Sequence, residues 1–316
     1  MFVAPQVLSF GGLGVTKREV RREVFAHVDA AVIPLYYTIA PVHVHAEAQG
    51  TARHSPGRLL RPALSVTGVE HDSVESGSSA TGVVLENGIV LTAGHFVDPY
   101  LSAIRASQPA TPSNPPPFAL ITPRHPVIGR GVKSVIVFAQ DIVRSREPGL
   151  DLAAIRFDFR EVPESFGLGA LQLSPDPLHV GDRTGVCGFS RELRALGSEE
   201  ARASFDECVV SALIQDDRVP VSGLSVIRVN THALPGMSGG PVFDLLTGAL
   251  HGILVDSVTV AVGEPRQPMR EAVGKMPPAL QPERRIPLGF AHAIAASHAR
   301  PLILQLGNLP PLRLVQ

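Results

Sequence analysis

The stretch PGMSGGP, residues 235–241, decides how the rest of the sequence is interpreted. Its serine, Ser238, has Gly and Pro as most of its neighbours. Gly permits positive φ and the close approach of another backbone, whereas Pro stiffens the turn. A serine on such a bare loop has an exposed hydroxyl and backbone N–H groups free to bind a substrate oxygen, which is what acyl transfer needs. An ordinary Gly-Pro turn with an incidental serine would have the same sequence, so residues elsewhere must distinguish the two.

The composition favours a folded protein rich in strands. A chain of 316 residues can hold two domains with a sizeable core, and 44% hydrophobic with 18% charged residues argues against disorder. The 29 Gly and 29 Pro break the chain into short pieces. A net charge of −1 and the absence of Trp argue against a nucleic-acid partner, and no apolar run approaches the roughly 20 residues of a membrane span. We therefore expect neither nucleic acid nor a membrane as a partner.

Short apolar and β-branched runs predict strands at the spacing of a sandwich or barrel. The first half holds runs at 28–38, 83–85, 89–92, 132–138 and 151–157, with the Asn-Gly turn signal between the second and third. Residues 161–178 contain three prolines and are the best candidate boundary between two halves. The second half holds runs at 184–188, 208–214, 224–229, 241–243, 250–255 and 288–291. We expect a short charged helix over 17–26 and a helix within 293–306 that Pro301 starts or breaks.

The two cysteines and the N-terminus bear on the compartment. Cys187 and Cys208 exclude a small disulfide scaffold, and they are either one bridge or two buried thiols, with free thiols favoured. The N-terminus lacks the basic start and continuous apolar run of a secretory signal. These features favour the cytoplasm, with secretion as the alternative, and leave the oligomeric state open.

Two further residues give Ser238 a chemical context. His95 ends the hairpin that begins near residue 83, and Asp151 opens a later strand. A hydroxyl nucleophile needs a base to take its proton, and that base needs a group that holds its tautomer and stabilises its cation. His95, Asp151 and Ser238 therefore form a candidate catalytic set.

The order and neighbours of these residues resemble the trypsin-like, chymotrypsin-fold serine peptidases. In that family the histidine motif reads Thr-Ala-Ala-His or close to it, the acid lies in Asp-Ile/Leu-Ala, and the nucleophile lies in Gly-x-Ser-Gly-Gly-Pro. This sequence has TAGH at 92–95, DLA at 151–153 and GMSGGP at 236–241. The resemblance covers roughly residues 27–300, and three motifs in the right order are far more specific than any one of them.

The resemblance implies an all-β fold of two six-stranded antiparallel β-barrels, with the active site in the cleft between them and a short C-terminal helix. We expect an irregular or helical N-terminal extension over 1–26, a first barrel over 27–165 and a second barrel with the C-terminal tail over 166–316. It implies a serine endopeptidase acting on protein or peptide substrates through an acyl-enzyme, without a cofactor or metal. Ser238 would be the nucleophile, His95 the base and Asp151 its orienting acid, with the N–H groups of Gly236 and Ser238 as the oxyanion hole.

Within the family the sequence is most similar to cysteine-poor members such as the Deg/HtrA peptidases and glutamyl endopeptidases, and we expect no PDZ-like domain to follow. Phe96 stands where many animal enzymes have a cysteine. Met237 stands where trypsin has the Asp that pairs with a new N-terminus after zymogen cleavage, so activation by that route is not expected. Gly94 in place of Ala is interpreted as a mild change.

The specificity pocket is inferred from the resemblance alone. The residue six before the nucleophile, His232, would line its floor, and the absence of an acid there argues against Arg or Lys substrates. Val255, Asp256 and Ser257 follow the strand that usually forms the pocket wall. A small or medium apolar side chain is the favoured occupant, and an acidic residue paired with His232 is the alternative.

Two rival interpretations have different chemistry. The first is a catalytically weak trypsin-fold binding or scaffolding module. The second is an esterase, although the His, Asp, Ser order and the absence of a Gly-x-Ser-x-Gly elbow argue against an α/β-hydrolase. His43 and His45 could also bind a metal on one strand face, but no acidic or cysteine cluster accompanies them, so an exposed strand edge or loop is favoured there. Residues 1–26 and 262–286 are expected to be able to cover the cleft.

Overall fold

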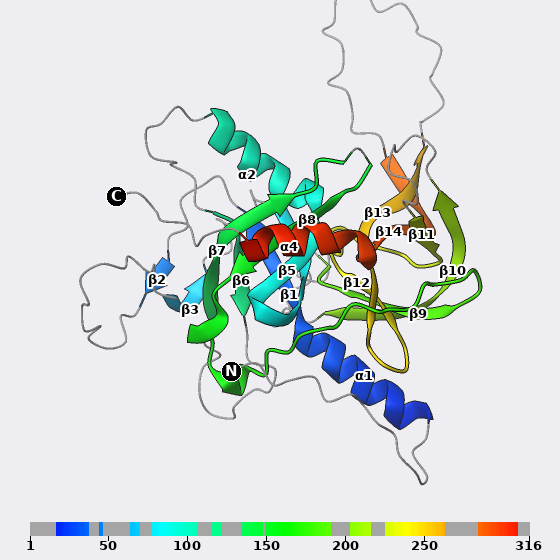
Figure 1. Ribbon diagram of the computed structural model, residues 1–316, viewed down its shortest axis with the longest axis horizontal. Coiled ribbons are helices and arrows are strands. Elements are labelled where there is room, and N and C mark those ends of the chain that lie inside the picture. The colour runs from blue at the N-terminus through cyan, green and yellow to red at the C-terminus, as the bar shows by residue number, and fades with distance from the viewer. Residues whose placement is uncertain are drawn as a thin grey trace, which may run out of the picture.

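A computed structural model describes residues 17–37, 44–46, 64–69, 78–106, 116–121, 134–147, 149–190, 203–215, 225–262 and 284–308. Two antiparallel sheets, each closed into a six-stranded barrel, lie side by side (Figure 1). The two-barrel, all-β prediction is confirmed.

The first barrel has the strand order β7-β6-β1-β4-β5-β8 and closes through pairing of β8 with β7. Two further strands, β2 and β3, extend the sheet from β7. Its strands are β1 (Val32–Tyr37), β2 (Val44–Ala46), β3 (Leu64–Val69), β4 (Ser78–Val84), β5 (Ile89–Ala93), β6 (Phe118–Ile121), β7 (Ser134–Arg144) and β8 (Leu152–Phe157).

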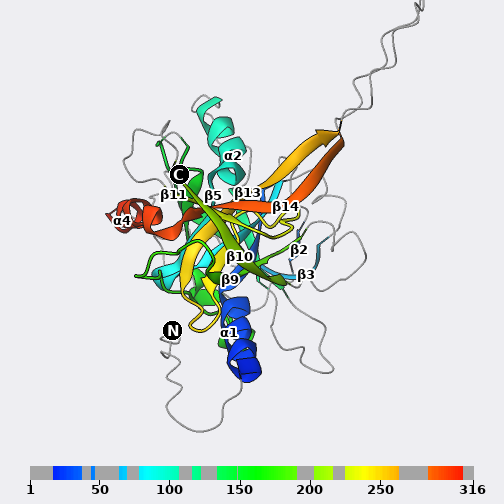
Figure 2. The same cartoon turned by 90° about the vertical axis from the view of Figure 1, so that its right-hand side faces the viewer.

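The second barrel has the order β10-β11-β14-β13-β12-β9. Its strands are β9 (Arg183–Gly188), β10 (Ser204–Gln215), β11 (Ser225–Val229), β12 (Pro241–Asp244), β13 (Leu250–Val262) and β14 (Arg284–Ala295). Figure 2 shows β13 and β14 running together as a long hairpin that projects beyond the barrel. Both strands therefore extend into the stretch 262–286, which was expected to be able to cover the cleft.

Period-two burial divides the first barrel's side chains between two apolar clusters. On β5, Val90 points into the barrel, whereas Ile89 and Leu91 point toward the second barrel. On β8, Ile155 points into the barrel and Leu152 points out of it. The outward residues join side chains of the second barrel in one shared cluster, so the two barrels pack through a continuous core.

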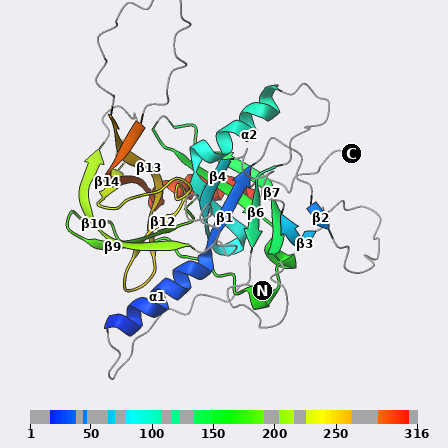
Figure 3. The same ribbon diagram turned by 180° about the vertical axis from the view of Figure 1, so that it is seen from behind.

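Helices connect and cover the barrels. They are α1 (Lys17–Ala31), α2 (Gly94–Ala106) and α4 (Arg300–Asn308), with short 3₁₀ turns η2 (Glu86–Gly88), η3 (Phe159–Glu161), η4 (Glu164–Phe166) and η5 (Ala296–Ala299). Seen from behind in Figure 3, α1 lies along the second barrel and leads into β1 of the first. In Figure 1 α4, which follows the second barrel, crosses β7 and β8 of the first.

The structure corrects the predicted start of the first strand. Residues 28–31 are helical, because Val24, Val28 and Ala31 lie on one face of α1 and are completely buried. The strand therefore begins at Val32. Phe25 on the same helix packs against Phe205 of the second barrel, so this part of residues 1–26 is docked.

Other elements follow the sequence more closely. The hairpin of β4 and β5 is present, with Gly88 in its turn at a φ of 74°. Pro301 is the second residue of α4, so it starts the C-terminal helix and does not break it. The chain passes between the barrels after Phe157 and enters β9 at Arg183. Both cysteines are free and buried, on neighbouring strands of the second barrel.

Candidate active site

The loop that carries Ser238 is held in shape by glycine and by the first barrel. Gly236 and Gly239 have φ values of 95° and 90°, which L side chains rarely adopt. A Cβ on Gly239 would lie 2.0 Å from the carbonyl oxygen of Thr81 on β4. The Gly-rich sequence therefore lets this loop of the second barrel come into direct contact with the first.

Thr81 is the contact point on the other side. Its N–H donates to the Ser238 carbonyl oxygen at 2.8 Å, and its hydroxyl donates to the Gly236 carbonyl oxygen at 2.8 Å. The same hydroxyl accepts from the N–H of Phe189, and the side chain is completely buried. Within the described part of the chain, the N–H groups of Gly236 and Ser238 take part in no hydrogen bond. The carbonyl groups of Gly236 and Ser238 are thus held by Thr81, while the N–H groups of the same two residues stay available as donors.

His95 and Asp151 form a close pair at the edge of the first barrel. His95 Nδ1 lies 2.7 Å from Asp151 Oδ2, and the His95 N–H donates to Asp151 Oδ1 at 2.8 Å. The N–H of Gly94 donates to the Asp151 carbonyl oxygen at 3.0 Å. Asp151, which was expected to open a strand, lies directly before β8, and His95 is the second residue of α2 and not the end of a strand.

Contact between His95 and Asp151 shifts the pKa of both side chains. The hydrogen bond to Asp151 raises the pKa of His95 against the effect of burial, and the carboxylates of Asp98 and Asp256 raise it further. Burial raises the pKa of Asp151, but its hydrogen bonds to His95 and the charges of His95 and Arg144 outweigh burial and hold that pKa below its ordinary value. The favoured state is an Asp151 carboxylate bound to an imidazole whose pKa is raised.

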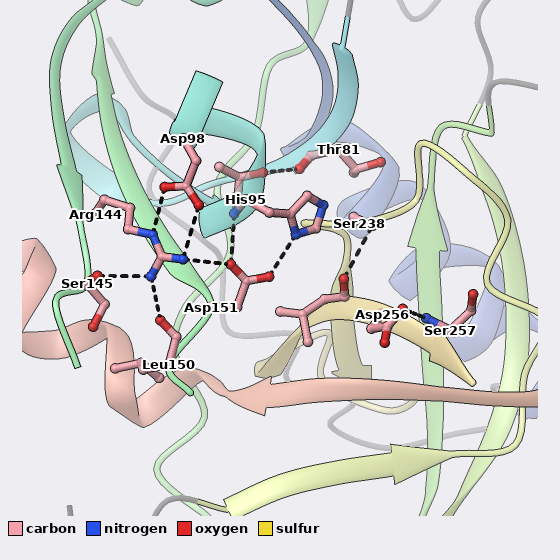
Figure 4. A network of polar contacts seen from close by, with 12 residues as sticks. Thr81, His95, Asp98, Arg144, Ser145, Leu150, Asp151, Ser238, Asp256 and Ser257 are labelled. Atoms are coloured by element: carbon pink, nitrogen blue, oxygen red, sulfur yellow. Dashed lines mark hydrogen bonds and ion pairs between the residues drawn. The ribbon is translucent and has the colours of Figure 1, made fainter. Parts of the chain in front are cut away.

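Ser238 comes to this pair from the second barrel. Figure 4 shows the ring of His95 between Asp151 and the Ser238 loop. Ser238 Oγ donates to the carbonyl oxygen of Val255 at 3.5 Å, and among the described residues no hydrogen bond joins it to His95. Hydrogen bonds of this kind are often long or unformed before substrate binds.

A small pocket of about 90 Å³ opens beside Ser238. Besides Ser238 itself, it is lined by Ala233, Leu234, Pro235, Leu254, Asp256 and Ser257. Two of the four residues assigned to the specificity pocket are thus part of it, Asp256 and Ser257. Asp256 is exposed, and its carboxylate accepts from the Ser257 N–H at 2.7 Å.

The other two residues assigned to that pocket have different positions. Val255 contributes its carbonyl oxygen to Ser238, while its side chain packs against the cluster between the barrels. His232 is exposed, with its ring next to Gly289 of β14, where a Cβ would lie 3.2 Å from the imidazole. His43 lies outside the described residues, and of His45 only the backbone in β2 is described.

Met237 is turned away from solvent. Its side chain is 3% exposed, lies against Gly188, and has its sulfur 3.4 Å from the N–H of Leu234. In the described residues no group of three or more His, Cys, Asp or Glu side chains could hold a metal ion. The described helices include none long and apolar enough to cross a membrane.

Sequence reasoning missed three residues of this site. They are Thr81, which holds the Ser238 loop, and Arg144 with Asp98, which lie next to Asp151 (Figure 4). One signal for Arg144 was present in the sequence, the Gly at position 94. A Cβ there would lie 2.8 Å from the guanidinium carbon of Arg144.

A family model described as a trypsin-like peptidase domain matches residues 80–253, more than half of the chain. The chain belongs to this trypsin-like peptidase family. The match begins just before Thr81 and ends in β13, so it spans His95, Asp151 and Ser238. No curated protein matches the sequence.

Solved structures agree with the fold of this peptidase. An HtrA-type protease, AlgW with tripeptide, matches with a TM-score of 0.50 and 15% identity over 91% of this chain. This chain spans 64% of that AlgW chain. The Rv3671c protease from M. tuberculosis in its active form matches with a TM-score of 0.50 and 13% identity, over 99% of this chain and 95% of the other. At these identities the likeness is evidence for the fold alone.

Proposed function

We propose that this trypsin-like peptidase is a serine endopeptidase that hydrolyses peptide bonds through His95, Asp151 and Ser238. The observation that carries the proposal is the 2.7 Å pair of His95 and Asp151 beside the loop that presents Ser238. On this proposal residues 27–165 supply the base and its acid, and residues 166–316 supply the nucleophile and the oxyanion donors.

The reaction begins when Ser238 Oγ attacks the substrate carbonyl carbon and His95 Nε2 takes its proton. Asp151 holds the Nδ1 proton toward itself and stabilises the imidazolium. His95 then gives the proton to the leaving amine, which leaves an acyl group on Ser238. Water repeats the sequence to release the acid. Ser238 reaches His95 by leaving the Val255 carbonyl, whose 3.5 Å contact is long for a hydroxyl donor.

The oxyanion of each tetrahedral intermediate is bound by the N–H groups of Gly236 and Ser238. Their lack of other partners in the described residues supports this role. A donor of this kind is worth about 2.7–4 kcal/mol of transition-state stabilisation. Peptide substrates fit the family and the fold, since the AlgW structure that this chain is similar to holds a tripeptide.

Met237 adds a statement about activation. Its buried thioether already holds the loop before Ser238, and it cannot form an ion pair with a new N-terminus. We therefore expect activity without N-terminal cleavage. Intact-mass measurement of the protein before and after an assay would check this, and activity that appears only with a shortened N-terminus would contradict it.

The proposal is tested by labelling with a fluorophosphonate and by hydrolysis of a peptide library. The protein should take up one label, Ser238→Ala should abolish both label and hydrolysis, and the control Ser297→Ala at an exposed serine should keep both. A protein that binds peptides without label or turnover would instead be a binding module. Turnover of esters without peptides would indicate an esterase.

A further inference from the structure

Arg144, the last residue of β7, lies beside the acid of the proposed triad. Its Nε and Nη2 bind the Asp98 carboxylate at 3.0 and 3.3 Å, and Nη2 also binds Asp151 Oδ1 at 3.2 Å. Its Nη1 donates to the carbonyl oxygens of Ser145 and Leu150 at 2.9 and 3.0 Å. A guanidinium has five N–H donors, so every one of them is used.

These bonds tie three elements to one planar group. Arg144 belongs to β7, Asp98 to α2 and Asp151 to the loop before β8. The planar guanidinium therefore has little freedom to rotate or to withdraw. The side chain is 26% exposed, so bulk water competes only in part for these contacts.

The consequence for Asp151 is a fixed carboxylate plane. Its Oδ1 accepts from Arg144 and from the His95 N–H, which leaves Oδ2 toward His95 Nδ1 at 2.7 Å. Without Arg144 the carboxylate would keep one backbone donor and could turn about its last torsion. The orientation of the imidazole depends on that plane.

Gly94 is part of the same arrangement. A Cβ at this position would lie 2.8 Å from Arg144 Cζ and 2.7 Å from Asp151 Oδ1. The end of an arginine ordinarily moves aside at little cost, but here its five hydrogen bonds prevent that. Where the family's histidine motif has Ala, this sequence has Gly94, and the missing Cβ leaves room for the Arg144 guanidinium.

We propose that Arg144 is a positioning residue of the active site, which fixes the Asp151 carboxylate for His95, and that Gly94 provides the space for its guanidinium. The inference rests on the proposed function, because it takes His95 as the base. It adds a cation to the set of groups that control this base.

Electrostatics gives the proposal a directional signature. The charged groups around His95 are the carboxylates of Asp151, Asp98 on α2 and Asp256 on β13, with Arg144 as the cation next to the first two. Arg144→Met frees the Asp151 carboxylate to turn away, which weakens the hydrogen bond that does most to raise the pKa of His95, so that pKa should fall. Asp98→Asn removes a negative charge, so it should lower the same pKa. A residue that only stabilised the fold would leave this pKa unchanged.

The kinetic experiment measures kcat, KM and the pH profile of peptide hydrolysis by the full chain. Arg144→Met should lower kcat on the order of 10–100-fold with KM little changed, and should move the acid limb of kcat/KM to lower pH. Arg144→Lys keeps the charge without the planar fork that fixes the carboxylate, so its kcat should also fall and its acid limb should also move to lower pH. Asp98→Asn should move the limb to lower pH. The control Arg146→Met removes an exposed arginine two residues away and should change nothing.

A second measurement does not need activity. In the Ser238→Ala protein, NMR titration reports the pKa of His95, and the downfield Nδ1 proton reports its bond to Asp151. Arg144→Met in this background should lower that pKa and weaken or broaden the proton signal. An unchanged titration together with unchanged kcat would overturn the proposal and leave the peptidase assignment intact. Loss of the peptidase assignment would leave the titration result valid.

The space argument is tested by combining substitutions at Gly94 and Arg144. Gly94→Ala should lower kcat, and the double variant Gly94→Ala with Arg144→Ala should lose less than the product of the two single losses. Coupling of this kind is expected only between residues in contact. Losses that multiply would contradict the role assigned to Gly94.

Discussion

At the scale of single residues, Thr81 joins the first barrel to the loop of the nucleophile. Its hydroxyl bridges the Gly236 carbonyl and the Phe189 N–H, and its backbone N–H binds the Ser238 carbonyl. The backbone bond survives any substitution other than proline, whereas the contacts of the hydroxyl are lost when the side chain has none. The side chain of Thr81 therefore controls the orientation of the Gly236 peptide, next to the proposed oxyanion donors.

Thr81→Val should damage catalysis more than binding. Valine has the shape of threonine but no hydroxyl. The Phe189 N–H and the Gly236 carbonyl oxygen would lose their hydrogen-bond partner, each at a cost of about 1–3 kcal/mol. We expect a lower melting temperature and a fall in kcat of roughly 10-fold, smaller than the roughly 100–1,000-fold loss that follows removal of an oxyanion donor. Thr81→Ser keeps the hydroxyl and should retain most of kcat. Equal kcat values for the Val and Ser variants would contradict this role.

The pH dependence follows from the same site. A general base must be neutral, and the hydrogen bond to Asp151 raises the pKa of His95 above 6.5. As the pH falls through that raised pKa the imidazole becomes protonated, so kcat/KM should fall along an acid limb with its midpoint above 6.5. Asp256→Asn removes one carboxylate that raises this pKa, and its limb should lie at lower pH. A wild-type midpoint below 6.5 would contradict the assignment.

At the scale of elements, helix α4 holds the second half of the chain against the first barrel. Leu302 and Leu306 are buried, Leu304 on the other face is 67% exposed, and Arg156 of β8 donates to the Leu306 carbonyl oxygen. Leu302→Ala should lower the free energy of unfolding by about 2–5 kcal/mol. The control Leu304→Ala should change it by less than about 0.5 kcal/mol. Equal melting temperatures for the two variants would argue against a stabilising contact between α4 and the first barrel.

Elements with local signals were predictable and elements stabilised by tertiary contacts were not. The β4–β5 hairpin has apolar strands and a turn glycine at positive φ, and both are visible in the sequence. Helix α2 starts with Gly94 and contains Pro99, both unfavourable in helices, and it is stabilised by burial of Phe96 and Val97 in the first barrel. No local pattern carries that information.

The same distinction applies to the candidate site. His95, Asp151 and Ser238 each lie in a short motif that could be recognised alone, whereas the partner of Arg144 on α2, Asp98, lies 46 residues away in the sequence. Such a contact depends on the register of β7 and the presence of α2. Gly94 was the one residue in the motifs whose identity indicated this contact.

At the scale of the whole molecule, the two barrels share a core. One apolar cluster joins Leu91 and Leu152 of the first barrel to Phe243 and Leu250 of the second. The interior of each barrel forms a separate cluster. Because unfolding of either barrel would expose the shared cluster, the barrels should stabilise each other and unfold together.

The sequence supplies a separate probe for each barrel. Its three tyrosines, Tyr36, Tyr37 and Tyr100, all belong to the first barrel and its helix α2, and there is no Trp. Its two cysteines, Cys187 and Cys208, belong to strands β9 and β10 of the second barrel.

Tyrosine fluorescence and thiol labelling in urea should therefore give the same midpoint. Burial raises the pKa of Cys208 to about 11, so its thiol should be unreactive until the second barrel opens. Leu250→Ala, in the shared cluster, should lower both midpoints together. Two separate midpoints would contradict the shared core, because labelling of the cysteines before the tyrosine transition would mean that the second barrel opens while the first remains folded.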